Sequence, residues 1–255
     1  MDSLFTGGVI LRRKFLAFAL SLVILCALVF ELYPRSSQEI DLSTGAGLSK
    51  MLRYENAQVY FFGEIHRCTE YQFRNALFKY LVEKKGVRVL LMEHGYASGF
   101  LENETVQNRL SFSDEYGYDQ FIVSKEDYEL FQWMSEFNQN RPDRDKISIV
   151  GIDITDSIGM VYAFCRYLLR DCDFSAADTK TQMLLISTQK CQFQQRFENS
   201  LLPQLIELYQ TNPEQLELAL GDQAIHLERV LQGWQQGQEC YKLNGYQPDL
   251  QLDGP

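Results

Sequence analysis

Clustered positive charge is scarce in this sequence. Outside Arg12, Arg13 and Lys14 there is no cluster of Lys and Arg, and the 255 residues carry a net charge of −10 at pH 7. Binding to a nucleic-acid backbone needs several cations close together, so we expect no nucleic-acid partner.

The cysteines also lack the spacing of a metal site. None of the six cysteines forms a Cys-x-x-Cys pair, so a structural zinc site is not predicted. In an exported domain, four of them could form up to two disulfides, and free buried thiols are the open alternative. These four are Cys165, Cys172, Cys191 and Cys240.

A long apolar run follows the basic triplet. Residues 15–30 contain Ser21 as their only polar residue, and Leu32 and Tyr33 extend the run to 33. This length is close to the ~20 residues that span a bilayer. No small-x-small cleavage site follows, so we expect an uncleaved membrane anchor at 15–33. The positive-inside rule then predicts a cytoplasmic tail at 1–14 and a domain on the extracytoplasmic side, periplasmic or extracellular.

The rest of the chain predicts an α/β fold, with a parallel sheet and flanking helices. We expect a linker at 34–50, an α/β domain at 51–170, a helical lid or extension at 171–240 and a loose tail at 241–255. In the α/β domain, strands at 58–63, 87–92 and 147–152 alternate with helices at 69–85, 125–138 and 157–169, a spacing typical of a parallel sheet. Further helices are expected at 182–210 and 213–236.

Each predicted strand ends in residues that can carry chemistry. The pairs are Glu64 and His66, Glu93 and His94, and Asp153 and Asp156. The ligand crevice of an open α/β sheet lies at the carboxyl ends of its strands, so these groups should converge there. Carboxylates beside an imidazole can support a general base or ligate a metal.

Each of these groups also has a purely structural interpretation. The first pair could be a polar turn after a buried strand, and the two aspartates could cap the following helix. His94 could be a surface histidine, and His226 could simply be packed in its helix. Arg67 or Arg74 could neutralise an anionic intermediate, although Arg74 is expected on a solvated helix face.

Several stretches together resemble the erythromycin esterase-like family. The resemblance covers about 59–169 and is carried by Phe-Gly-Glu-Ile-His at 62–66, the helix at 71–81, Val-Arg-Val-Leu-Leu-Met-Glu at 87–93, the helix at 130–138 and Val-Gly-Ile-Asp at 150–153. It implies an α/β hydrolase that cleaves an ester in a small molecule without a metal or other cofactor. His66 would activate water, and Glu64 and Glu93 would support it; Arg67, His94 and Asp153 are possible additional site residues.

The sequence departs from this family in three ways. Ile65 alone separates the Glu and His of the first motif, where the esterases have two residues, and Arg67 replaces a Gly. The single-residue spacing is closer to the haem-uptake and Tiki-type members of the wider superfamily, which leaves haem or divalent-metal binding as an alternative function. No later strand carries the second catalytic His of the esterases. Either the chain is a shortened, inactive member, or His94 or His226 substitutes.

Overall fold

The computed structural model describes residues 41, 47–48, 52, 57–63, 71–111, 124–154 and 156–243. The chain forms two compact units, Met1–Glu55 and Asn56–Pro255, and nearly all of the described residues belong to the second. The anchor predicted at 15–33 lies outside the described residues. Within the described part, no helix is long and apolar enough to cross a bilayer.

Two parallel strands form the sheet of the described structure. They are β1 (Val89–Gly95) and β2 (Ser148–Asp153), with Leu90 paired to Ile149 and Leu91 to Val150. The parallel arrangement of the strands predicted at 87–92 and 147–152 is confirmed. The strand predicted at 58–63 is wrong, because 57–63 belong to no helix or strand. An apolar run becomes a strand only when a neighbour pairs with it, and here the Val59 and Phe61 side chains are exposed.

Helices cover one face of this sheet. The helical segment predicted at 69–85 is described from Tyr71 onward as α3 (Tyr71–Tyr80) followed by the π-helical turn η1 (Leu81–Lys85). Gly86 ends it in the left-handed conformation, with a φ of 73°. The helix predicted at 125–138 is confirmed as α5 (Lys125–Asn138), with Ser124 as its N-cap. Apolar side chains of α3, η1 and α5 pack with Met92 and Ile149 in one core.

Helix α4 (Tyr96–Val106) follows β1 directly and packs against β2. The contact is made between backbones, because Gly99 of α4 and Gly151 of β2 lie against each other. A Cβ on Gly99 would lie 2.6 Å from the Cα of Gly151. Ala97 and Leu101 of α4 belong to a second core formed with the C-terminal helices, whereas Val106 belongs to the first core. Helix α4 therefore contributes side chains to both cores.

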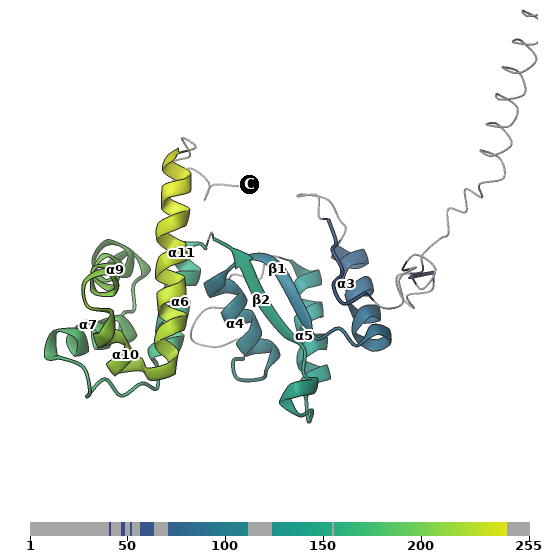
Figure 1. The fold of residues 1–255 in the computed structure, drawn as a ribbon, viewed down its shortest axis with the longest axis horizontal. Coiled ribbons are helices and arrows are strands. Elements are labelled where there is room, and N and C mark those ends of the chain that lie inside the picture. The colour runs from purple at the N-terminus through teal and green to yellow at the C-terminus, as the bar shows by residue number, and fades with distance from the viewer. Residues whose placement is uncertain are drawn as a thin grey trace, which may run out of the picture. The chain divides into compact units, whose positions relative to one another are not determined.

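The chain after β2 is helical, as predicted (Figure 1). The helix predicted at 157–169 is confirmed, beginning one residue later. The segment predicted at 182–210 is not one helix, because 190–193 are not helical. The predicted loose tail begins too early, since 241–243 belong to the last helix. The remaining elements are η3 (Asp143–Asp145), α6 (Ile158–Leu169), α7 (Thr179–Gln189), α8 (Gln194–Arg196), η4 (Phe197–Leu201), α9 (Leu202–Thr211), α10 (Pro213–Leu220), η5 (Gly221–Gln223) and α11 (Ala224–Leu243).

The second face of the sheet carries exposed apolar side chains. Leu91 is 56% exposed and Ile152 is 60% exposed, and Val89 and Val150 are exposed beside them. These residues alternate along β1 and β2 with those that point into the core, as the two-residue period of a strand requires. Among the residues that the structure describes, helices therefore cover only one face of the sheet.

No disulfide joins Cys165, Cys172, Cys191 or Cys240, so the disulfide alternative is wrong for these four residues. Cys165 and Cys191 are buried.

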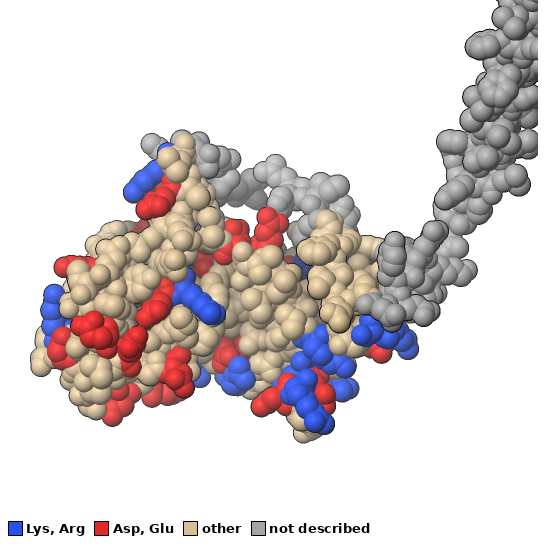
Figure 2. Space-filling model, in the orientation of Figure 1, with Lys and Arg blue, Asp and Glu red and all other residues tan. Residues whose placement is uncertain are grey.

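On the face shown in Figure 2, acidic side chains spread over the end formed by α7, α9 and α10, whereas Lys and Arg side chains gather near η3. On this face, acidic and basic side chains are thus unevenly distributed.

Candidate functional site

The carboxyl end of β1 contains an irregularity next to its polar residues. Met92 pairs with Gly151 and Gly95 pairs with Asp153, so β1 has one more residue than β2 between these pairs. Glu93 and His94 occupy this bulge. Bulges redirect side chains and occur often beside active sites. The described structure therefore brings Glu93, His94 and Asp153 to one end of the sheet, as the sequence predicted.

A buried carboxylate on α4 holds the imidazole of His94. Nδ1 of His94 lies 2.7 Å from Oε1 of Glu102, whose side chain is only 7% exposed. The other carboxylate oxygen, Oε2, is buried and has no hydrogen-bond partner in the described part of the chain. Glu102 therefore fixes the orientation of the imidazole and retains an unused acceptor.

This pairing also changes the acidity of His94. Burial lowers the pKa of His94, but the hydrogen bond to Glu102 and the Glu102 charge outweigh burial, so the pKa is raised above its ordinary value. His94 consequently holds its proton to higher pH than an exposed histidine. A protonated imidazole in a fixed orientation can donate a proton to a leaving group.

A second ion pair lies close enough to influence His94. Arg74 of α3 forms an ion pair with Asp127 of α5, and both side chains are nearly buried. Asp127 also accepts a hydrogen bond from Ser124 Oγ at 2.8 Å, and Asn75 Oδ1 accepts from Arg74 at 3.2 Å. The Asp127 charge raises the pKa of His94 and the Arg74 charge lowers it. The expectation that Arg74 lies on a solvated helix face is wrong.

Asp156 has a structural role that the sequence only partly indicated. Its carboxylate accepts hydrogen bonds from the backbone N–H groups of Ala97 and Ser98, at 2.9 and 3.1 Å, and from Ser98 Oγ at 2.7 Å. Asp156 therefore caps the start of α4, whereas the helix that follows it is capped by Ser157. Burial raises the pKa of Asp156, although these hydrogen bonds oppose the shift.

The other predicted site residues are placed as follows. Glu64, His66 and Arg67 lie outside the described residues. Glu93 is exposed at the bulge, and Asp153 is half-buried and accepts a hydrogen bond from Ile154 N at 2.7 Å. His226 is on α11, where its Nδ1 lies 2.7 Å from Oη of Tyr96, the residue that follows β1.

Sequence reasoning missed Glu102. The available signal was an acidic residue at a buried position of a helix that begins directly after a predicted strand. Its partner His94 is eight residues earlier, on the strand itself, so helix periodicity could not reveal the pair. Among the described residues, no group of three His, Cys, Asp or Glu side chains is arranged to hold a metal ion.

Comparisons with known proteins leave the family unassigned. No family model and no curated protein matches the sequence. One solved structure, titled a succinoglycan biosynthesis protein, aligns at 18% identity with a TM-score of 0.41 and covers 64% of this chain and 41% of its own. Another, from Bacillus cereus, aligns at 17% identity with a TM-score of 0.39 and covers 70% of this chain and 45% of its own. The chain thus spans less than half the length of both.

Proposed function

We propose that this protein is a membrane-anchored hydrolase that cleaves an ester bond in a small molecule. The main support is the His94–Glu102 pair, which fixes an imidazole at the carboxyl end of two parallel strands. Glu93 and Asp153 lie at the same end. Further support is the resemblance of 59–169 to erythromycin esterase-like sequences, in which a His and two Glu perform hydrolysis.

The proposed reaction uses two histidines with different tasks. His66, supported by Glu64 and Glu93, takes a proton from water while the water oxygen attacks the ester carbonyl. The tetrahedral intermediate then collapses, the bond to the alkoxy oxygen breaks, and that oxygen takes a proton from His94. The raised pKa of His94 suits it to this donation, and His94 would substitute for the second catalytic His that the sequence lacks.

A panel of chromogenic esters tests the proposal on the full-length chain in detergent. We expect turnover that resists a chelator, because no step requires a metal. His66→Gln and His94→Gln should each lower kcat by roughly 10²- to 10⁴-fold, the usual contribution of a positioned acid or base. Glu93→Gln should also lower turnover. Glu214→Gln is the matched control, since Glu214 is an exposed acid on α10.

Other outcomes would contradict the hydrolase. A Soret shift on adding haem, or bound metal lost in His66→Ala, would favour the binding function if no ester is cleaved. The absence of both turnover and binding would favour a shortened, inactive member of the superfamily. Turnover that survives both histidine substitutions would remove the proposed mechanism.

A further inference from the structure

A pocket of about 500 Å³ lies among α4, α6 and α11, a volume typical of small-molecule sites. Glu104 of α4 lines it, whereas Glu102 faces His94. These two residues are two positions apart, so their side chains leave the helix about 200° apart. The pocket therefore lies on a different side of α4 from the proposed catalytic site.

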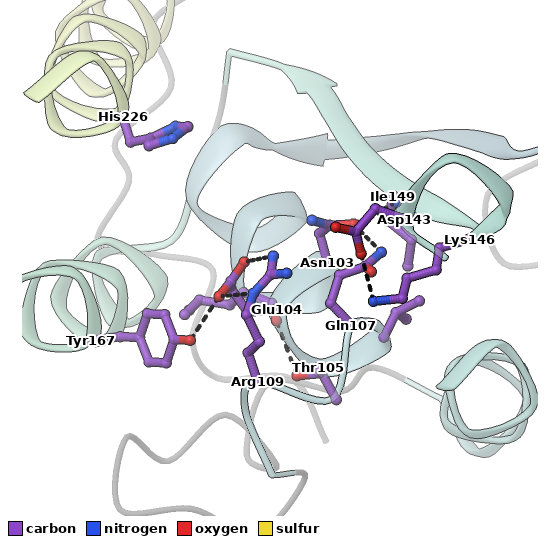
Figure 3. A network of polar contacts seen from close by, with 12 residues as sticks. Asn103, Glu104, Thr105, Gln107, Arg109, Asp143, Lys146, Ile149, Tyr167 and His226 are labelled. Atoms are coloured by element: carbon purple, nitrogen blue, oxygen red, sulfur yellow. Dashed lines mark hydrogen bonds and ion pairs between the residues drawn. The ribbon is translucent and has the colours of Figure 1, made fainter. Parts of the chain in front are cut away.

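In one wall of the pocket, both oxygens of the Glu104 carboxylate accept hydrogen bonds. Glu104 accepts hydrogen bonds from Arg109, through Nε at 2.8 Å and also through Nη2, and from Tyr167 Oη at 2.8 Å (Figure 3). Burial opposes ionisation of Glu104, but these partners lower its pKa. Burial and the hydrogen bond to Glu104 raise the pKa of Tyr167 to about 12, so the hydroxyl stays a donor. Both Glu104 oxygens are thus already used within the wall.

A second guanidinium in the pocket is also held in place. The Arg170 guanidinium lies 3.5 Å from the centroid of the Tyr167 ring, and its Nη1 donates to the Tyr167 carbonyl oxygen at 2.9 Å. Its ion pair with Asp171 is at the surface, where the Asp171 side chain is 85% exposed. Stacking and hydrogen bonding fix the orientation of Arg170 before any ligand arrives.

The third polar group is His226 on α11. Its Nδ1 lies 2.7 Å from Tyr96 Oη, which accepts a hydrogen bond from Arg229 Nη1 at 3.3 Å. In the tautomer that satisfies both contacts, Tyr96 Oη accepts from Arg229 and donates to Nδ1, and the ring carries its own hydrogen on Nε2. Burial, with the nearby Arg229 charge, lowers the pKa of His226, which keeps the ring neutral. His226 thus adds an N–H donor to the pocket lining.

These groups leave the pocket with more donors than acceptors. Arg109 and Arg170 each have five N–H groups, of which the described structure uses only some, and His226 adds one more. Both oxygens of the buried acceptor, Glu104, already accept hydrogen bonds. The ligand must therefore supply acceptor oxygens, and the half-buried ring of Phe100 offers an apolar surface for its body.

We propose that this pocket binds a small organic monocarboxylate with an apolar body. The carboxylate would accept hydrogen bonds from Arg109 and Arg170, which suit the planar geometry of that group. One negative charge fits better than two. Asp171 is 85% exposed, so water screens its charge, and inside the pocket Glu104 balances only one of the two guanidinium charges. A phosphate dianion would leave its second charge without a partner.

Ligand-observed NMR on the full-length chain tests the proposal with matched probes. Benzoate, cyclohexanecarboxylate and butyrate are each compared with the neutral amide of the same shape, and inorganic phosphate is added as a competitor. We expect the carboxylates to bind at least about tenfold more tightly than the amides, since charge-assisted hydrogen bonds are the stronger kind. Arg170→Gln should weaken carboxylate binding by a similar factor. Arg196→Gln, at an exposed position that does not line the pocket, should leave it unchanged.

Imidazole NMR signals then locate the site. The chain has three histidines, and His226→Gln identifies the signal of His226. Benzoate should shift that signal and leave the His94 signal in place. Equal binding of acids and amides, unchanged binding in a folded Arg170→Gln protein, displacement of benzoate by equimolar phosphate, or no binding of any carboxylate would each overturn the proposal. None of these readouts depends on ester hydrolysis.

Discussion

Gly99 of α4 and Gly151 of β2 lie against each other with no side chain between them. A Cβ on Gly99 would lie 2.6 Å from the Gly151 Cα, and a Cβ on Gly151 would lie 2.7 Å from the His94 carbonyl oxygen. This contact lets α4 approach the sheet closely enough for Glu102 to reach His94. The glycine pair therefore supports the geometry of the candidate site although it has no chemistry of its own.

Gly99→Ala should destabilise the fold. The new methyl group would overlap backbone atoms of β2, which cannot move without breaking the sheet, so we expect a loss of about 3 kcal/mol or more. Gly233→Ala is the matched control, because Gly233 is also helical and a Cβ there would lie 3.7 Å from its nearest neighbour, Ile154 O. That control should be neutral or stabilise by up to about 1 kcal/mol. Urea unfolding of both variants measures the difference, and equal stabilities would show that the contact relaxes easily.

Glu102→Gln should lower the pKa of His94. The folded-state pKa of His94 is raised above its ordinary value by Glu102, so the pair stabilises the fold most below about pH 6.5. This contribution is lost as pH rises through the folded-state pKa. The destabilisation caused by Glu102→Gln should therefore be larger at pH 6 than at pH 9.

The pH dependence of turnover should also depend on the pKa of His94. If protonated His94 donates to the leaving group, turnover falls as pH rises through the pKa of His94, and Glu102→Gln should move that limit to lower pH. NMR titration of the imidazole and a pH profile of kcat check both statements. An unchanged His94 titration would show that Glu102 only packs there.

Asp127 should be important for stability through both of its contacts. It forms an ion pair with Arg74 and a hydrogen bond with Ser124 at the start of α5. Asp127→Ala leaves the nearly buried Arg74 without its partner, which typically costs about 3–5 kcal/mol. Ser124→Ala removes the N-cap and should cost about 1 kcal/mol. A double-mutant cycle with Arg74→Ala, followed by urea unfolding, should give a coupling energy of about 0.5–3 kcal/mol between Arg74 and Asp127. A coupling near zero would contradict the ion pair.

The N-terminal segment should hold the protein in the membrane with its domain on the extracytoplasmic side. Protease added to spheroplasts should digest the domain that follows the linker at 34–50, while a tag placed before Arg12 stays protected. Deleting 15–33 should release the protein from the membrane fraction. Protection of the domain in spheroplasts, together with its digestion after lysis, would place it in the cytoplasm instead.

Local patterns predicted most of the described fold. The helix at 125–138 and the strands near 87–92 and 147–152 carry strong periodicity or continuous apolar character and occur close to where they were expected. The strand predicted at 58–63 was wrong for a physical reason. Residues with a high β-propensity form a strand only where another strand pairs with them. The break at 190–193 was missed because an apolar stripe can continue across two packed helices.

The candidate site was less predictable than the fold. Strand ends could be found from sequence, so Glu93, His94 and Asp153 were placed at one edge of the sheet. Glu102 and Arg74 could not be found this way, because their partners are fixed by tertiary packing. A buried acid on a helix resembles a surface acid in sequence until the neighbouring strand is positioned.

The exposed face of β1 and β2 affects how molecules of this protein meet in solution. Val89, Leu91, Val150 and Ile152 present apolar side chains to water, and apolar surfaces on two molecules attract each other. The net charge of −10 keeps molecules apart at low ionic strength. At 0.1 M salt the Debye length is about 10 Å, so the repulsion between molecules is largely screened beyond that distance. The apolar attraction remains. Self-association should therefore increase with ionic strength, which is the reverse of the behaviour of an assembly held together by ion pairs.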